Sequence, residues 1–146
     1  MSIQRTIERL KPFWHRITPL EGFEAIDEIE SRVGYPLPAD LKHFYQWFSN
    51  GGEGQLPGGY LQMFPAEEIL GIQRQYRVRE IGKALLFATD GDEGFAFDLT
   101  RGAASARYPV IQFSLASMDP EEVELVAEDF DSFLSSRLRE DRKSVV

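Results

Sequence analysis

The first third of the chain carries apolar residues at helical spacing, with polar residues between them. The first apolar stripe consists of Ile7, Leu10, Trp14 and Ile17. Pro12 interrupts this segment. Because proline has no N–H and clashes with the preceding turn, the pattern predicts a short helix followed by a bend or a restart.

A second amphipathic helix is predicted directly afterwards. Its apolar positions advance in steps of three, three and four residues: Phe23, Ile26, Ile29 and Val33. Acidic and basic residues occupy most of the positions between them, as expected for a helix that packs one face on a core. Gly34 is well suited to end this helix.

A third helix is predicted after the stretch Tyr-Pro-Leu-Pro at residues 35–38. This entrance is stiff because a residue before proline favours extended geometry, and Pro38 suits the first helical position. The helix is expected to run for about three turns. Its buried stripe is predicted to be Leu41, Phe44, Tyr45 and Phe48. Asn50-Gly51-Gly52 tolerates positive φ and is predicted to end it.

The middle of the chain alternates between turn signals and short apolar runs, which predicts strands. Residues 51–59 are rich in glycine and are predicted as a loop that leads into a strand near Tyr60–Met63. The residues Pro-Ala-Glu-Glu at 65–68 indicate the start of a helix. Asp90-Gly91 is a tight-turn signal between two strands. The later strands are predicted at Leu85–Ala88, Phe95–Leu99 and Val110–Phe113.

A long helix is predicted at the C-terminal end. Asp119 suits the N-cap and Pro120 suits the first helical position. Glu121 and Glu122 then fall in the first turn, where carboxylates offset the helix dipole. The apolar stripe of this helix is predicted to be Val123, Val126, Phe130, Phe133, Leu134 and Leu138.

Helices, then hairpin-connected strands, then a terminal helix predict an α+β fold. We expect the N-terminal helices and the C-terminal helix to pack on a mostly antiparallel or mixed sheet of about four strands. The chain has 146 residues, with no low-complexity linker and no internal repeat. Residues 1–146 are therefore expected to form a single domain.

The charge balance narrows the class of partner. The chain has 24 acidic and 16 basic residues and a net charge of −8. This excess argues against direct binding of nucleic acid, because such binding depends on neutralising phosphates with Lys and Arg. It fits a solvated surface or a basic partner. With no cysteine, no signal-peptide pattern and no apolar run of membrane-spanning length, a cytoplasmic protein without membrane contact is expected.

Motifs for cofactors and metals are weak in this chain. Residues 52–57 resemble the start of a dinucleotide loop, but a proline replaces the third glycine and the segment follows a predicted helix. Asp90, Asp92 and Asp98 carry oxygen ligands that suit calcium, but their spacing does not fit an EF-hand. We therefore expect no metal and no cofactor.

Catalytic motifs are weak as well. The two histidines, His15 and His43, are far apart in sequence, and His43 is expected on the solvent side of its helix. No catalytic residue is therefore predicted. Paired carboxylates for glycoside cleavage stay open, because their spacing is set by the three-dimensional structure.

Four sequence features occur in one order along the chain. They are Glu30…Gly34…Leu37-Pro38, Phe44 followed by Asn50-Gly51-Gly52, the acidic-glycine turn within residues 87–99, and the pattern A-x-x-F-x-x-F-L at 127–134. Together they resemble the signature of the SUKH superfamily, which includes fungal regulators of cell-wall synthesis and bacterial immunity proteins. The resemblance covers about residues 22–138.

The resemblance implies a non-catalytic protein-binding domain. In bacteria such domains are commonly immunity proteins, which bind a cognate toxin, often a nuclease, and block it. A carboxylate-rich surface suits the basic groove of a nuclease and speeds association. Two alternatives stay open: a regulatory or scaffold role with endogenous partners, and binding of a small ligand or glycan in a cleft between residues 51–59 and the sheet.

The candidate partner-binding residues are acids of the Asp-Gly turn and of the predicted C-terminal helix: Asp90, Asp92, Glu93, Glu121, Glu122, Glu124 and Glu128. Each also has a purely structural explanation, because Asp-Gly suits a tight hairpin and acids suit a first helical turn. The residues that carry the resemblance are expected to hold the scaffold instead: Gly34, Leu37, Pro38, Phe44, Asn50, Gly51 and Gly52.

Two other features bear on binding. Trp47 lies on the flank of the third helix's stripe, and it is either covered by the N-terminal segment near Phe13 or Trp14, as we expect, or exposed as an anchor. The second feature is a basic strip that is able to meet an acidic face of another copy, although the sequence leaves the oligomeric state open. This strip consists of Arg74, Arg77 and Arg79.

Overall fold

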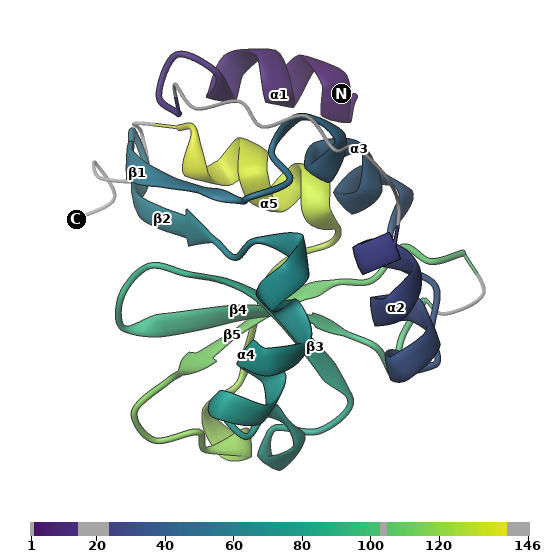
Figure 1. Ribbon diagram of the computed structural model, residues 1–146. Coiled ribbons are helices and arrows are strands. Elements are labelled where there is room, and N and C mark those ends of the chain that lie inside the picture. The colour runs from purple at the N-terminus through teal and green to yellow at the C-terminus, as the bar shows by residue number, and fades with distance from the viewer. Residues whose placement is uncertain (1, 15–23, 103–104, 140–146) are drawn as a thin grey trace.

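The computed structural model describes residues 2–14, 24–102 and 105–139, and it shows an α+β fold built on one antiparallel sheet (Figure 1). The helices are α1 (Ile3–Leu10), α2 (Glu24–Val33), α3 (Ala39–Trp47), α4 (Ile69–Gln75) and α5 (Phe130–Arg137), with short 3-10 turns η1 (Ala66–Glu68), η2 (Val78–Glu80) and η3 (Pro120–Glu122). The strands are β1 (Gly52–Leu56), β2 (Gly59–Met63), β3 (Ala84–Thr89), β4 (Glu93–Asp98), β5 (Val110–Ser114) and β6 (Glu124–Ala127). The predicted fold class is confirmed.

The strand order of the sheet follows the order of the chain. Each strand pairs with the next in antiparallel fashion, from β1 to β6. β1 and β6 are therefore the two edges. The register shifts between Leu86 and Ala88 in β3, and between Val110 and Ile111 in β5. Such shifts bend a strand and increase its twist.

An aromatic cluster joins the sheet to α1, α3 and α5, which lie together on one side of the molecule (Figure 1). Phe87 stacks on Phe97 with 4.4 Å between ring centroids and meets the edge of Phe130 at 5.6 Å. Phe44 of α3 meets the same Phe130 ring at 5.7 Å, and Trp14 meets Phe44 at 6.2 Å. Burial of each such side chain contributes about 1.5–3 kcal/mol, so this cluster is a main source of stability.

The helix α4 is held to β3 by a side-chain amide that imitates a neighbouring strand. The Gln73 Nε2 donates to the Leu86 carbonyl at 2.8 Å, and the Leu86 N–H donates to the Gln73 Oε1 at 2.8 Å. The same Nε2 also donates to the Ile69 carbonyl at 2.8 Å. These bonds satisfy a backbone N–H and carbonyl of β3 and fix the position of α4.

Periodicity predicted α2 and α3 well. Gly34 directly follows α2 with φ +82°, as helix-ending glycines do. The helix α3 ends at Trp47 with Phe48 as its C-cap, before the predicted Asn50-Gly51-Gly52. Pro38 is the N-cap of α3, with extended ψ of 137°, and not the first helical residue as predicted. Two predicted stripe residues, Ile17 and Phe23, lie outside the described residues, as does His15.

The prediction of a loop over residues 51–59 was wrong, because Gly52–Leu56 forms β1 and pairs with β2. The reason is a close approach to an aromatic ring. A Cβ on Gly52 would lie 2.6 Å from Cε3 of Trp14, so glycine is required where the strand passes this side chain. A hollow of about 470 Å³ lies beside the start of this strand and is lined in part by Gly51, Gly52 and Gln62, so binding of a small ligand there stays a prediction.

The prediction of a single long C-terminal helix was also wrong. Residues 120–137 instead form η3, the strand β6 and the shorter helix α5. Asp119 does cap a helical turn, since its side chain accepts from the Glu121 N–H, but that turn is η3. The following residues form β6, which pairs with β5. The sheet therefore has six strands, whereas about four were predicted. Tertiary pairing here overrides a pattern that fits both helix and strand.

Candidate functional site

The turn between β3 and β4 is held by its own polar groups. The Asp90 Oδ1 accepts from the backbone N–H of Asp92 at 3.0 Å and of Glu93 at 2.8 Å. The Thr89 hydroxyl donates to the Glu93 carbonyl at 2.8 Å and accepts from the Gly91 N–H at 3.0 Å. Asp90 therefore has a structural role in the turn, as the alternative explanation from the sequence expected. Asp92 is exposed and Glu93 is half-buried.

Acids from β6 and η3 lie near this turn. Glu93 of β4 aligns with Ser114 of β5, and Glu124 of β6 aligns with Gln112 of β5. Partial burial raises the pKa of the Glu93 carboxyl above its ordinary value. The neighbouring carboxylates that raise this pKa further are, in order of effect, Asp90, Asp92, Glu124 and Glu122. We call these five residues, Asp90, Asp92, Glu93, Glu122 and Glu124, the acidic surface.

The acidic surface has few internal partners. Within the part of the chain that the structure describes, none of its five carboxylates forms an ion pair. The Ser117 hydroxyl donates to the Glu122 carboxylate at 3.3 Å. Like charges that gather without a counter-ion repel one another, and a cationic partner would relieve that repulsion.

Two predicted residues do not belong to this group. Glu128 is exposed and acts on the guanidinium of Arg107, raising the Arg107 pKa after the larger effects of Asp129 and Asp40. It therefore lies with the Arg107–Asp129 pair near the start of α5. Glu121 is exposed on η3, and its N–H donates to the Asp119 side chain at 2.9 Å.

Two apolar side chains beside the acidic surface were missed. Leu125 of β6 is 60% exposed and Val126 is 37% exposed, and both are large apolar residues on an edge strand. The helical periodicity of the sequence instead predicts Val126 in a buried stripe. The alternation of Glu122, Val123, Glu124 and Leu125 is the strand signal that was available in the sequence. Exposed apolar residues with a polar rim are typical of interaction sites.

Four of the seven residues that we expect to hold the scaffold are buried, whereas Gly34 and Asn50 are exposed and Gly52 is half-buried. The Glu30 carboxylate accepts from the Leu37 N–H at 2.7 Å and pairs with Lys42 at 2.8 Å. Partial burial raises the Glu30 pKa, but these two interactions outweigh it and leave the pKa below its ordinary value. The glutamate thus ties α2 to the entrance and the first turns of α3. Leu37, Pro38, Phe44 and Gly51 are buried.

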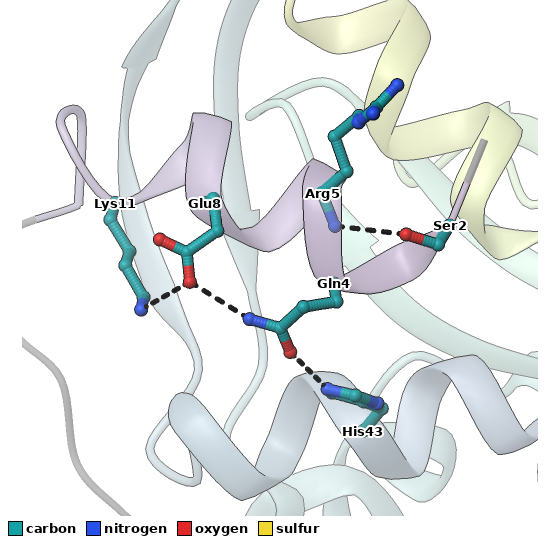
Figure 2. Close-up of polar contacts among 6 residues, drawn as sticks. All are labelled: Ser2, Gln4, Arg5, Glu8, Lys11 and His43. Atoms are coloured by element: carbon teal, nitrogen blue, oxygen red, sulfur yellow. Dashed lines mark hydrogen bonds and ion pairs between the residues drawn. The ribbon is translucent and has the colours of Figure 1, made fainter.

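A polar contact joins α1 to α3 at His43 (Figure 2). The His43 Nε2 lies 2.6 Å from the Gln4 Oε1, and because an amide oxygen only accepts, Nε2 carries the proton. The Gln4 Nε2 donates to Glu8, which also pairs with Lys11, each at 2.9 Å. The prediction of a solvated His43 was wrong, since it is half-buried in a helix–helix contact.

Trp47 is covered in part by the N-terminal segment, as expected, but by a different residue. The Lys11 Nζ lies 4.0 Å from the centroid of its ring, a cation–π contact. Trp14 instead packs into the core, where it is 3% exposed, and Phe13 is exposed. The structure thus gives Trp47 a packing role between α1 and α3.

The described residues include no group of three or more His, Cys, Asp or Glu placed to hold a metal ion. Among the helices of the described ranges, none has the length and apolar character needed to cross a membrane.

Comparison with known proteins places the chain in a family. A model of the SMI1/KNR4 family (SUKH-1) matches residues 23–136, which run from α2 into α5 and include the acidic surface. No match was found among curated proteins. The chain therefore belongs to the SMI1/KNR4 family (SUKH-1), which supports a toxin-immunity or SMI1/KNR4-like protein-binding role.

Proposed function

We propose that this protein is a non-catalytic, cytoplasmic immunity protein that binds and neutralises a cognate bacterial toxin. The observation that carries the proposal is the acidic surface together with the exposed Leu125 and Val126 on the edge strand that carries Glu124. Apolar side chains at the centre of an interface supply most of the binding energy, and surrounding charges supply specificity and speed.

The acidic surface favours a basic partner. A nuclease exposes cationic side chains where it binds phosphate, and five carboxylates without counter-ions in the described residues complement such a groove. Electrostatic attraction of this kind raises the association rate, and salt weakens it. A nuclease domain is therefore the toxin class that we propose first.

The edge strand β6 provides the apolar part of the interface. Leu125 and Val126 directly follow Glu124, so this short edge strand carries both apolar and acidic residues. Leu125 points to the opposite face of the strand from Glu124, because successive side chains alternate. Loss of an apolar contact at the centre of an interface mainly raises the dissociation rate, whereas loss of a charge at the rim mainly lowers the association rate. The two kinds of variant are therefore expected to differ kinetically.

The test is co-expression of the protein with the toxin domain encoded beside its gene, followed by pull-down, a nuclease assay and binding kinetics. We expect Glu93→Lys/Glu124→Lys to slow association at least about tenfold at low salt, and Leu125→Ala to speed dissociation. Asp27→Lys/Glu28→Lys is the matched control, because both residues are exposed on α2 and the change in charge is the same. Equal effects of the two charge variants would exclude the acidic surface as the binding site.

Binding alone does not establish immunity. Protection of cells and inhibition of the nuclease by the wild-type protein are the expected results. If the neighbouring gene product is neither bound nor inhibited, the immunity role is wrong. Capture of an endogenous protein without protection from any toxin would support the regulatory role instead.

A further inference from the structure

A basic cavity lies away from the acidic surface. Its volume is about 780 Å³, and it lies between the end of α2, the α4–η2 segment and the first residues of β3. Four cationic side chains line it, Arg74, Arg77, Arg79 and Lys83, against a single acid, Glu80. This is an unusual concentration of positive charge on a chain whose net charge is −8.

Most of this positive charge is not neutralised within the protein. Arg77 approaches Glu80 only to 4.0 Å. Arg74, Arg79 and Lys83 form no ion pair with any residue that the structure describes. All four side chains belong to exposed residues, so they are free to close on a ligand. Cations that share a cavity repel one another, and a bound anion turns that cost into attraction.

The backbone also departs from its relaxed form here. Arg77 has φ 54° and ψ 48°, the left-handed conformation that a residue with a Cβ rarely adopts. Such conformations are strained and cluster at functional sites. The turn at Arg77 lets the last turn of α4 and the following η2 contribute arginines to one cavity.

The cavity has an apolar side as well as a cationic one. Val33, Val78, Ala84 and Leu99 line it, together with the half-buried ring of Tyr35. Its volume falls in the range of small-molecule sites, about 300–1,000 Å³. Arginine guanidinium groups match phosphate oxygens in geometry, and an aromatic ring next to apolar side chains suits a planar group. We propose that this cavity binds a nucleoside diphosphate or a ligand of the same chemistry, with phosphates on the arginines and the planar group beside Tyr35.

A second copy of the chain is a less suitable occupant. The acidic surface of one molecule would have to meet the basic cavity of the next, which is a head-to-tail contact between different surfaces. Contacts of this type continue into filaments unless they happen to close a ring. A small ligand also fits a concave site better than a protruding turn such as Asp90–Glu93 of a second copy would.

The test is calorimetric titration of the purified chain with ADP, pyrophosphate and adenosine at low and physiological salt. We expect saturable binding of ADP, at least about tenfold tighter than that of either fragment, because only ADP engages both sides of the cavity. Arg79→Glu/Lys83→Glu should weaken ADP binding by about tenfold or more, since hydrogen bonds to charged groups are the strong ones. The control Arg5→Glu/Arg9→Glu changes the charge equally on exposed residues of α1 and should retain the affinity.

Three results would overturn the inference. They are no saturable ADP binding at low salt, binding of pyrophosphate as tight as that of ADP, and equal losses in the cavity variant and the control variant. Light scattering of the wild-type chain measures whether a second copy of the chain occupies the cavity instead. Self-association that is abolished by Arg79→Glu/Lys83→Glu would assign the cavity to a contact between copies and would also overturn the inference.

Discussion

Lys83 directly precedes β3 and Asp90 directly follows it, so the basic cavity and the turn acids of the acidic surface lie at opposite ends of one strand. A strand of this length spans about 20 Å, which exceeds the Debye length of about 8 Å at physiological salt. Each end therefore presents its own charge to solvent. A basic partner that approaches the Asp90 end leaves the Lys83 end open.

Leu125→Ala is expected to leave the folded state intact. Its side chain is 60% exposed, so the free energy of unfolding should change by less than about 0.5 kcal/mol. Phe130→Ala is the contrasting variant, because Phe130 is buried among aromatic rings and its loss should cost about 3–5 kcal/mol. Urea unfolding followed by circular dichroism measures both. A large loss of stability in Leu125→Ala would show that its role is packing, not binding.

Gly51→Ala and Gly71→Ala are expected to change stability in opposite directions. A Cβ at Gly51 would lie 2.1 Å from the Met63 carbonyl oxygen, and the φ of +69° is strained for alanine, so the loss should be about 2 kcal/mol or more. Gly71 lies in α4, and a Cβ there would meet no atom within 4 Å, so alanine should add about 0.5–1 kcal/mol. Chemical unfolding at equilibrium measures the free energy of unfolding of both variants. A higher free energy of unfolding for Gly51→Ala than for the wild type would contradict the close approach to the Met63 carbonyl.

Glu93→Gln is expected to stabilise the protein at neutral pH and low salt. The Glu93 pKa is raised by burial and by neighbouring carboxylates, so its protonated form is favoured in the folded state. The associated stability is present below the ordinary pKa of 4.5 and is lost as the pH rises through the raised value. A neutral glutamine avoids that loss, for a gain below about 1 kcal/mol after solvent screening.

The control for this variant is ionic strength. Thermal unfolding at low and high salt should show the gain from Glu93→Gln shrinking as salt screens the carboxylates. A variant that is less stable than the wild type at low salt would contradict the repulsion that we infer for the acidic surface.

The helices and the central hairpin were predictable because their signals are local. Ile26 and Ile29 fix one face of α2, and Gly34 with positive φ directly follows its end. Asp90-Gly91 required a tight turn between two apolar runs, and the structure has β3 and β4 on either side of it. In these segments local preference and tertiary packing agree.

The two edge strands depended on contacts that the sequence order does not reveal. Gly52 has a poor preference for strands, and it is accepted in β1 because the Trp14 ring fills the space beside it. The segment from Val123 to Val126 fits a helical and an alternating pattern, and pairing of Leu125 with Ile111 of β5 decides between them.

The candidate site was predictable only in part for the same reason. The turn acids were recognised as a group from their order in the chain. The approach of Glu124 to Glu93 depends on β6 as a strand, in a segment where the sequence predicts a helix. The three arginines at 74, 77 and 79 were noted as a basic strip, but their convergence with Lys83 on a cavity is a tertiary feature.

Asp129→Asn is expected to reduce stability at neutral pH and to have little effect in acid. The carboxylate caps α5 by accepting from the Ser132 N–H at 2.8 Å, and it accepts two hydrogen bonds from the Arg107 guanidinium at 2.9 and 2.6 Å. Burial raises the Asp129 pKa, but these interactions outweigh it and leave the pKa below its ordinary value of 3.8. The stabilisation is therefore present above that ordinary value and is lost as the pH falls through the lowered one.

Asparagine retains the capping oxygen and loses the charge, so Asp129→Asn should cost about 1 kcal/mol at pH 7. Asp129→Ala removes the cap as well and should cost roughly a further 1 kcal/mol. Urea unfolding at about pH 7 and about pH 3 measures the pH dependence. Asp119→Asn is the control, because Asp119 caps η3 and forms no ion pair with a described residue. A cost of Asp129→Asn that stays the same at both pH values would show that the charge of Asp129 does not stabilise α5.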